Sequence, residues 1–202
     1  MAEFPVSPLE RAAPNMPIII IRHAETQENR NRIVQGHRPG QLTETGRRQA
    51  RDLSLTLLEY GRLDQIISSD LERARETADL ISEEIPPCKI VHETQLRERC
   101  YGRLEGRPVY QLKRLLIEHK RDLRALWIPD GEPYEDFELR ITDVYRRLIA
   151  GNPDQNSIVV THAGVIQVIL VKILGRTWWD IGNCEGFRLS FTVNGNAEVH
   201  SL

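Results

Sequence analysis

The stretch that decides the fold runs over residues 18–26 and reads Ile18-Ile19-Ile20-Ile21-Arg22-His23-Ala24-Glu25-Thr26. A run of isoleucines is β-branched and apolar, which is typical of a strand buried on both faces. Such strands belong to parallel sheets that helices cover from both sides. Arg22 and His23 follow directly, at the point where the strand leaves the sheet. We therefore expect a central strand that delivers polar side chains to one edge of a sheet.

The rest of the chain alternates between strand and helix patterns. Further strands are expected at 65–68, 89–92 and 157–161. Helices are expected after the turn 42–46, from a cap at Ser69 or Asp70 to about residue 84, and over 105–126, 134–150 and 164–174. Asn194-Gly195 is typical of a hairpin turn between strands at 187–193 and 197–201. This order predicts an α/β fold: a three-layer α/β/α sandwich with a mostly parallel central sheet and an antiparallel edge.

Composition limits the classes of protein that the chain can represent. It has 202 residues, of which 40% are hydrophobic and 28% charged, and its formal net charge is −2. This balance is that of an ordinary globular protein and argues against a general nucleic-acid binder. No apolar stretch reaches the roughly 20 residues that a membrane-spanning helix needs. Its three cysteines are widely spaced, which indicates neither a disulfide framework nor a metal site and favours a cytoplasmic location.

The first residues differ from the rest. Residues 1–16 contain three prolines and no periodic apolar pattern, so we expect a flexible N-terminal tail there. The basic start and apolar middle of a signal peptide are both missing. A single domain is expected over residues 17–202.

Three predicted strand ends place basic and imidazole side chains together. Arg22 and His23 end the first strand, Arg73 lies one turn into the helix after residues 65–68, and His162 follows residues 157–161. Ala163 comes next and is small enough to let a ligand approach the start of the following helix. Because ligands bind at the carboxyl ends of parallel strands, we expect these residues to share one site.

The chemistry that such a site suits is phosphoryl transfer. The arginine fork matches phosphate oxygens and stays charged, and a neutral imidazole is a competent nucleophile. Any one of these residues alone would more often be structural or solvated. Their predicted co-location favours the functional interpretation.

The sequence motifs of other enzymes that act on phosphate esters are absent from the chain. The chain contains no GxxxxGK[ST] loop, no cysteine followed six residues later by arginine, no DxD pair and no HExxH. We therefore expect catalysis without a metal and without a cofactor. The charged segment 96–106 contains Glu98, a candidate general acid for the leaving group, although spacing alone favours a solvated loop.

These pieces, in order over residues 18–175, resemble the signatures of the histidine phosphatase superfamily, the phosphoglycerate mutase-like fold. The segments are Arg22–Thr26 with Asn29, Leu42–Gly46 followed by Gln49-Ala50, Ser68–Ala78, Leu96–Gly106, and Thr161–Gly164. The chain departs from the pattern at Ala24 and Ala163, where glycine is usual, and in the loop 36–41.

The resemblance implies a role for each matching residue. His23 would be the nucleophile that becomes phosphohistidine, and Glu98 the general acid and base. Arg22, Arg73 and His162 would complete the catalytic pocket. The remaining expected phosphate- and substrate-binding residues are Asn29, Gly36, Arg99, Tyr101 and Ala163.

Mutases of this family typically carry a longer insert between the acidic glutamate and the second histidine, whereas the span from Glu98 to His162 is short. The resemblance therefore favours the phosphatase branch. We expect a metal-independent phosphomonoesterase for small phosphorylated metabolites, a sugar phosphate or a phospho-acid, in one catalytic domain. The alternatives are a cofactor-dependent phosphoglycerate mutase and a catalytically weak phospho-ligand binding or scaffold protein.

Two further questions about partners stay open in the sequence. Four arginines around Glu98 would either bind a second anionic group of the substrate or point to water; they are Arg97, Arg99, Arg103 and Arg107. A small phosphorylated metabolite is the expected partner, with neither nucleic acid nor membrane, and homodimer formation is left open.

Overall fold

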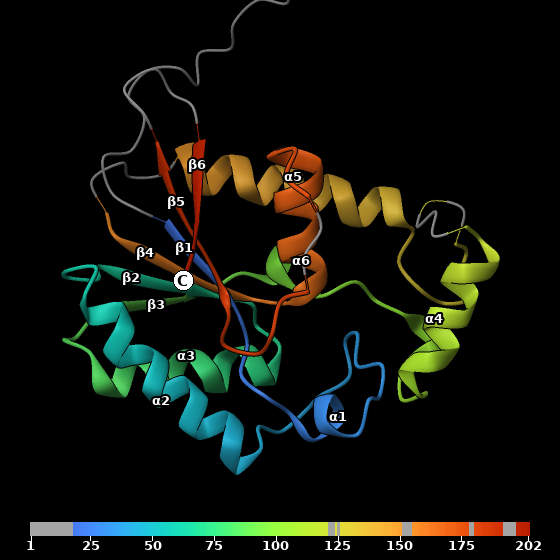
Figure 1. Cartoon of the computed structure of the whole chain (residues 1–202), viewed down its shortest axis with the longest axis horizontal. Coiled ribbons are helices and arrows are strands. Elements are labelled where there is room, and N and C mark those ends of the chain that lie inside the picture. The colour runs from blue at the N-terminus through green and yellow to red at the C-terminus, as the bar shows by residue number, and fades with distance from the viewer. Residues whose placement is uncertain (1–17, 121–123, 125, 151–154, 178–179, 192–196) are drawn as a thin grey trace, which may run out of the picture.

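The computed structural model describes residues 18–120, 124, 126–150, 155–177, 180–191 and 197–202. Helices cover both faces of a six-stranded sheet with the order β3-β2-β4-β1-β5-β6 (Figure 1). Four strands, β1 to β4, are mutually parallel, while β5 pairs antiparallel with β1 and β6 pairs antiparallel with β5. The expected three-layer α/β fold with a mostly parallel sheet is confirmed. The expected N-terminal tail, residues 1–16, lies outside the described residues.

The strands lie close to their predicted positions. Their bounds are β1 Ile18–Arg22, β2 Gln65–Ser68, β3 Lys89–His92, β4 Ser157–Thr161, β5 Gly186–Phe191 and β6 Ala197–Ser201. The antiparallel pairing of β5 with β6 confirms the hairpin edge, although its turn lies outside the described residues. In the described part of the chain, no helix is both long enough and apolar enough to cross a membrane.

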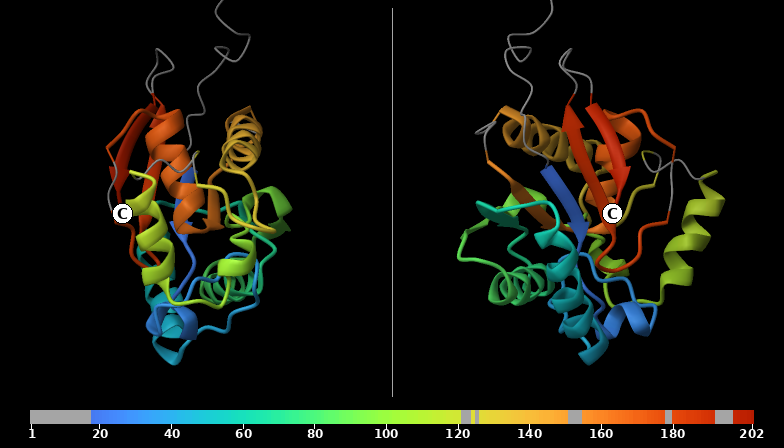
Figure 2. Two further views of the ribbon diagram at one scale, coloured as in Figure 1. Left: turned by 90° about the vertical axis from the view of Figure 1, so that its right-hand side faces the viewer. Right: turned by 60° about the vertical axis from the view of Figure 1, so that its left-hand side comes forward.

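The isoleucine run explains why the sheet has two covered faces. Alternate side chains of a strand point to opposite faces, and Ile18 and Ile20 pack in one hydrophobic cluster while Ile19 and Ile21 pack in another. The first cluster includes residues of α5 (Tyr134–Ala150) and α6 (Ala163–Gln167), and the second includes residues of α2 (Glu44–Leu58) and α3 (Glu72–Glu84). Figures 1 and 2 show these two helix pairs on opposite sides of the sheet.

Three helix boundaries differ from the predicted ones. The N-cap of α3 is Leu71 rather than Ser69 or Asp70, because the Asp70 carboxylate pairs with Arg97 and the Ser69 hydroxyl contacts His162. Of the helix expected over 105–126, the described residues form α4 (Val109–Glu118), which begins directly after Pro108, while residues 121–123 and 125 lie outside the description. The helix expected over 164–174 is α6 followed by a π-helical turn, η4 (Val168–Ile173).

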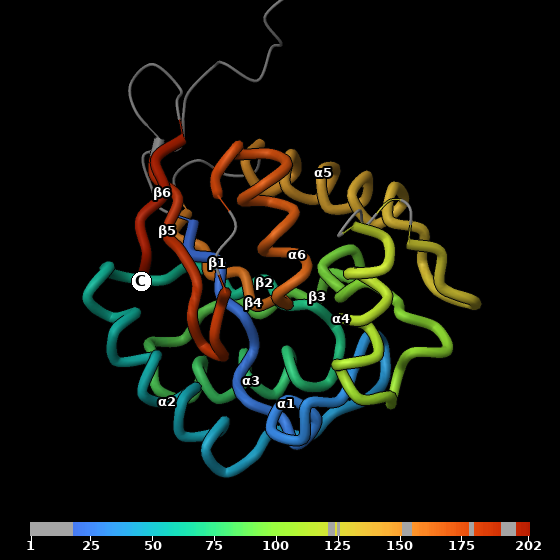
Figure 3. Tube along the Cα trace, turned by 45° about the vertical axis from the view of Figure 1, so that its right-hand side comes forward, coloured from blue at the N-terminus to red at the C-terminus, as the bar shows by residue number. Residues whose placement is uncertain are grey.

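The remaining elements are short and lie in the connections. They are α1 (Gln27–Arg30), η2 (Thr94–Leu96) and η3 (Gly102–Leu104). Both α1 and α4 lie at the end of the molecule toward which β1 runs (Figure 3). The carboxyl ends of the parallel strands are therefore surrounded by connecting segments that can form a site.

Candidate active site

A cavity of about 150 Å³ lies where β1 ends, and it brings most of the predicted site residues together. The residues that line it from the strand ends and the segment 96–106 are Arg22, His23, Arg73, Glu98, Tyr101 and Ala163. The connection after β1 and helix α4 complete it with Asn29, Ile33, Val34, Gln35, Gly36, Val109 and Leu112. Parallel pairing of β1 with β4, with Arg22 opposite Thr161, brings the two histidine-bearing ends together.

His23 is held in one tautomer by its own neighbour. Its Nδ1 lies 2.8 Å from the carbonyl oxygen of Ala24, so Nδ1 donates a proton to that oxygen. Nε2 is then the unprotonated nitrogen, and it accepts a hydrogen bond of 3.2 Å from Nε of Arg73. Burial, reinforced by Arg73 and Arg22, lowers the pKa of His23 well below its usual value of 6.5. The imidazole is therefore neutral at physiological pH, with a lone pair on Nε2.

Two arginines supply positive charge to the cavity. Arg73 is 1% exposed, and its Nη1 and Nη2 donate to the carbonyl oxygens of Arg38 (3.1 Å) and Gly36 (2.8 Å). Arg22 donates from Nη1 to the carbonyl oxygen of Ile181 at 2.6 Å, and its buried Nε has no hydrogen-bond partner among the described residues. Burial lowers the pKa of Arg73 to about 10, which leaves its guanidinium charged at neutral pH.

His162 lies behind His23 rather than in the lining of the cavity. The two rings have centroids 5.2 Å apart, and His162 is completely buried. Its Nε2 lies 2.8 Å from the Ser69 hydroxyl, while its buried Nδ1 has no partner among the described residues. Burial and the charge of Arg73 lower the pKa of His162 well below 6.5.

Glu98 lies at the cavity with both carboxylate oxygens held by backbone donors. Oε1 accepts from the amide of Arg99 at 2.9 Å, and Oε2 accepts from the amide of Gly164 at 3.1 Å. A Cβ on Gly164 would lie 2.2 Å from Oε1, so a larger residue would push the carboxylate away. The carbonyl oxygen of Glu98 accepts from Nε2 of His37 (2.8 Å) and Nη2 of Arg140 (3.0 Å).

Arg140 of α5 fixes the segment around Glu98 more broadly. Its Nη1 donates to the carbonyl oxygens of Gln95 (2.7 Å) and Arg97 (2.8 Å). Its Nε and Nη2 also pair with the carboxylate of Glu132, at 2.6 and 2.9 Å. One guanidinium thus joins the backbone on both sides of the candidate acid. Sequence reasoning missed this residue, because its spacing marks it only as a polar position on an amphipathic helix.

Asn183 is a second residue that sequence reasoning missed. Its Nδ2 donates to the carbonyl oxygen of His23 at 2.9 Å and to Oδ1 of Asn29 at 3.1 Å. Oδ1 of Asn29 also accepts from the amide of Thr26, at 3.2 Å. Asn183 therefore ties the backbone of His23 to the predicted phosphate ligand Asn29. Nothing in the local sequence marks it, since it lies in a loop more than 150 residues from both partners.

Of the remaining predicted ligands, Gly36, Tyr101 and Ala163 line the cavity and Arg99 does not. Arg99 is 2% exposed, and it donates to the carbonyl oxygens of Glu132 (2.9 Å) and Leu126 (3.3 Å). Its guanidinium also lies over the ring of Tyr134, 5.5 Å from the centroid. Arg99 is thus buried against Tyr134 and these carbonyl groups rather than at the cavity, and its Nη1 has no hydrogen-bond partner among the described residues.

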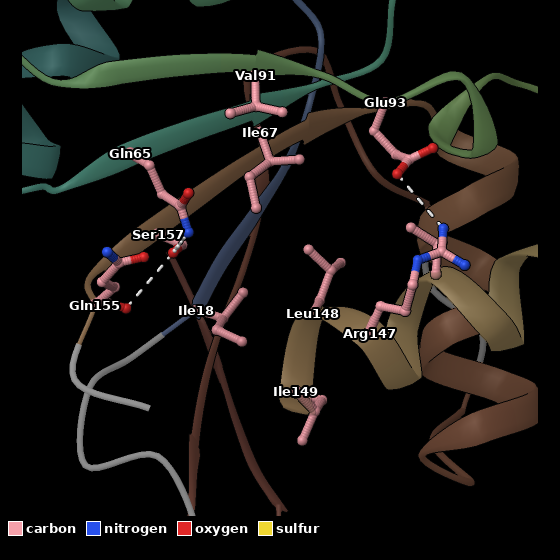
Figure 4. Close-up of a pocket in the computed structure, with 11 residues that line it drawn as sticks. Ile18, Gln65, Ile67, Val91, Glu93, Arg147, Leu148, Ile149, Gln155 and Ser157 are labelled. Carbon is pink, nitrogen blue, oxygen red and sulfur yellow. Dashed lines mark hydrogen bonds and ion pairs between the residues drawn. The ribbon is translucent and has the colours of Figure 1, made fainter. Parts of the chain in front are cut away.

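A second cavity, of about 180 Å³, lies at the opposite, amino ends of the parallel strands (Figure 4). Ile18, Gln65 and Ser157 are the first residues of their strands, and Leu148 closes the cavity from α5. Its lining is mainly apolar and amide, with one ion pair between Arg147 and Glu93 at 3.4 Å. It contains no histidine and a single cation, Arg147, so the cavity at His23 is the candidate for the active site. Among the residues the structure describes, no group of three or more His, Cys, Asp or Glu could hold a metal ion.

The fold and this cluster of residues define a known class of protein. The family model of the histidine phosphatase superfamily (branch 1) matches residues 18–199. The chain therefore belongs to this superfamily, and it is a phosphatase.

Particular relatives agree with this class. The chain is 32% identical to an adenosylcobalamin/alpha-ribazole phosphatase of Salmonella typhimurium, over 90% of this chain and 98% of that protein. The crystal structure of the alpha-ribazole phosphatase from Shigella flexneri is similar with a TM-score of 0.78 and 27% identity, covering 93% of this chain and 96% of that one. The structure of phosphoglycerate mutase from Bacillus anthracis shares the fold, with a TM-score of 0.81, 23% identity and coverage of 94% and 93%.

Proposed function

We propose that this phosphatase hydrolyses monoesters of small phosphorylated metabolites through a phosphohistidine on His23. The observation that supports this most is the unprotonated Nε2 of His23, which lies in the cavity 3.2 Å from the guanidinium Nε of Arg73. A lone pair beside a fixed cation is what an attack on a phosphate monoester requires.

In the first step Nε of Arg73 exchanges its hydrogen bond to Nε2 of His23 for one to a phosphoryl oxygen, which frees the lone pair of Nε2. Nε2 then attacks the phosphorus atom, and a bond from nitrogen to phosphorus forms as the ester P–O bond breaks. The developing negative charge on the phosphoryl oxygens is stabilised by Arg22 and Arg73. Glu98, in its protonated form, gives its proton to the leaving alkoxide, which departs as an alcohol. Asn29 and the amide of Ala163 are the remaining proposed donors to the phosphoryl group.

In the second step water attacks the same phosphorus atom. Glu98, now a carboxylate, accepts a proton from that water, and the bond between nitrogen and phosphorus breaks. Inorganic phosphate leaves, and the lone pair returns to Nε2 of His23. The hydrogen bond from Nδ1 to Ala24 keeps the ring in the same orientation through both steps. His162 is proposed to support His23 from behind through the packing of the two rings.

The unpartnered donor of Arg22 supports an anionic ligand at this site. A buried N–H without an acceptor costs about 1–3 kcal/mol, which a phosphate oxygen would recover. The same donor set supplies the positive charge that the reaction needs from the chain itself, so we expect hydrolysis to continue in EDTA.

The test is release of inorganic phosphate from a panel of phosphorylated metabolites, with and without EDTA. We expect His23→Ala to abolish release, whereas His200→Ala, a change at an exposed histidine on the edge strand β6, leaves it unaffected. Full activity in His23→Ala, or fast isomerisation of 3-phosphoglycerate with negligible hydrolysis, would overturn the proposal.

A further inference from the structure

The lining of the cavity falls into two chemically different sets. The reactive set consists of the charged residues Arg22, Arg73 and Glu98 and the neutral His23, and all four have a role in the proposed reaction. The rest of the described lining is uncharged, and most of it is apolar. Its larger apolar members are Ile33, Val34, Val109, Leu112 and the ring of Tyr101, and we call these five residues the apolar wall. A leaving group bound beside the phosphate would contact this wall.

Backbone hydrogen bonds join the two chain segments that form most of the apolar wall. The amide of Val34 donates to the carbonyl oxygen of Arg107, and the amide of Val109 donates to that of Arg32, both at 2.8 Å. Ile33 pairs with Pro108 in an isolated antiparallel bridge between these bonds. The wall is thus assembled before any ligand arrives, which lowers the entropic cost of binding against it.

The first turn of α4 contributes to the wall without belonging to the hydrophobic core. No residue of α4 is buried, yet Val109 and Leu112 line the cavity from its first turn. Apolar side chains that stay partly exposed beside a reaction centre are the ones that a ligand can cover with a gain in free energy.

The four arginines near Glu98 do not supply a charge to this wall. Arg97 pairs with Asp70 (Nε to Oδ1, 2.7 Å) and Arg103 pairs with Asp130 at 2.7 Å. Arg99 donates from Nε and Nη2 to backbone carbonyl oxygens, its buried Nη1 has no partner among the described residues, and its side chain does not line the cavity. The fourth, Arg107, is exposed and does not line the cavity. A second anionic group on the substrate would therefore meet uncharged side chains.

Building on the proposed function, we infer that the preferred substrates are monoesters of uncharged alcohols that present an apolar or aromatic face next to the phosphate. Esters that carry a second anion, such as phosphoglycerates and bisphosphates, are disfavoured. A carboxylate placed against the apolar wall would lose hydration without gaining a partner, and unpaired burial of a charge is costly. The specificity therefore depends on Val109 and Leu112 of α4 together with residues 33–34.

Two synthetic esters that differ by one carboxylate isolate this effect. Benzyl phosphate and 4-carboxybenzyl phosphate have the same scissile bond and the same ring. We expect kcat/KM for benzyl phosphate to exceed that for 4-carboxybenzyl phosphate by about tenfold or more. Equal values would overturn the inference.

A matched pair of variants assigns the effect to the wall. Leu112→Arg places a cation at the cavity, and it should lower the preference for benzyl phosphate at least severalfold by raising kcat/KM for the carboxylated ester. Ile117→Arg adds the same charge to α4 at a position that is 67% exposed and does not line the cavity, and it should leave the preference unchanged. The same preference in all three proteins would also overturn the inference.

The outcome separates this inference from the proposed function. If both esters are hydrolysed equally and His23→Ala stops both reactions, the wall has no role in specificity while the phosphohistidine mechanism stands. If His23→Ala hydrolyses either ester at the wild-type rate, the proposed function itself fails.

Discussion

Arg73 and His23 are joined directly, with the guanidinium Nε donating to the imidazole Nε2 over 3.2 Å. The contact joins a cation to the lone pair of the proposed nucleophile, and further hydrogen bonds from Arg73 to the carbonyl oxygens of Gly36 and Arg38 hold the guanidinium beside the cavity. Burial is the main reason why the pKa of His23 is low, and the nearby positive charge of Arg73 lowers it further. Arg73 thus helps to keep the proposed nucleophile neutral and also supplies charge to the phosphoryl group.

Arg73→Lys is therefore expected to be a severe change despite the conserved charge. A lysine offers a single ammonium in place of a planar fork with three separate partners. We predict a fall in kcat/KM of about 100-fold or more, the size seen when one preorganised donor at a transition state is lost. Phosphate release measures it, and thermal unfolding checks that the variant folds. Activity within threefold of the wild type would contradict this role.

Arg140 should act on catalysis without touching the cavity. Arg140→Met removes the links to Gln95, Arg97 and Glu98 and leaves Glu132 without its partner at 18% exposure. We expect a loss of about 3 kcal/mol in the free energy of unfolding, typical of breaking a largely buried ion pair, together with a lower kcat.

The matched control is Arg103→Met, which breaks an ion pair with Asp130 in which both side chains are at least 69% exposed. Exposed pairs of this kind contribute about 0–1 kcal/mol, so stability and kcat should stay near wild type. Chemical denaturation and steady-state kinetics give both quantities. Equal effects of the two changes would refute a special role for Arg140.

Loss of the amide donor of Asn183 alone should impair both catalysis and stability. Asn183→Asp keeps the shape of the side chain but replaces the N–H donor with an oxygen that would face the carbonyl oxygen of His23 and Oδ1 of Asn29. Because acceptors then face acceptors, we predict about a tenfold lower kcat/KM and a less stable protein. Kinetics at pH 7 with a saturating and a limiting substrate concentration measure it. Wild-type kinetics in this variant would show that the link to His23 is dispensable.

The buried histidines should make the protein less stable in acid. Their pKa values lie well below 6.5 in the folded protein, because burial disfavours the cation, but near 6.5 in the unfolded chain. Below pH 6.5 the unfolded chain therefore binds protons that the folded protein does not, and stability falls as the pH drops. Each histidine should cost about 1 kcal/mol between pH 7.5 and 5.5.

Urea denaturation at the two pH values measures this cost. His162→Gln should reduce the difference between pH 7.5 and 5.5, whereas the same change at the exposed His200 should not. A difference that is unaltered by His162→Gln would mean that this histidine is already protonated in the folded protein.

Much of this arrangement could be predicted from the sequence. The isoleucine run and the strand at 157–161 are long, apolar and β-branched, so their burial and parallel pairing determine where Arg22, His23 and His162 lie. Residues that act through contacts with a distant backbone segment have no comparable pattern in the sequence. Arg140 and Asn183 are recognised only when the chain has folded, because their partners are far away in the sequence.

The helix boundaries and the arginines near Glu98 show a second limit of prediction from the sequence. The helix expected at 105–126 begins only after Pro108, and ion pairs with Asp70 and Asp130 decide where Arg97 and Arg103 point. Charge spacing alone could not distinguish an anion site from a framework. That choice depends on tertiary partners such as Tyr134, over which Arg99 lies.

The central claim is that the phosphoryl group passes through Nε2 of His23. It is tested most directly by rapid quenching of the enzyme during turnover of a ³²P-labelled monoester. The account predicts a labelled protein that is stable in base and labile in acid, that disappears on a chase with unlabelled substrate, and that is absent from His23→Ala. Steady release of phosphate with no labelled protein at any quench time would contradict it.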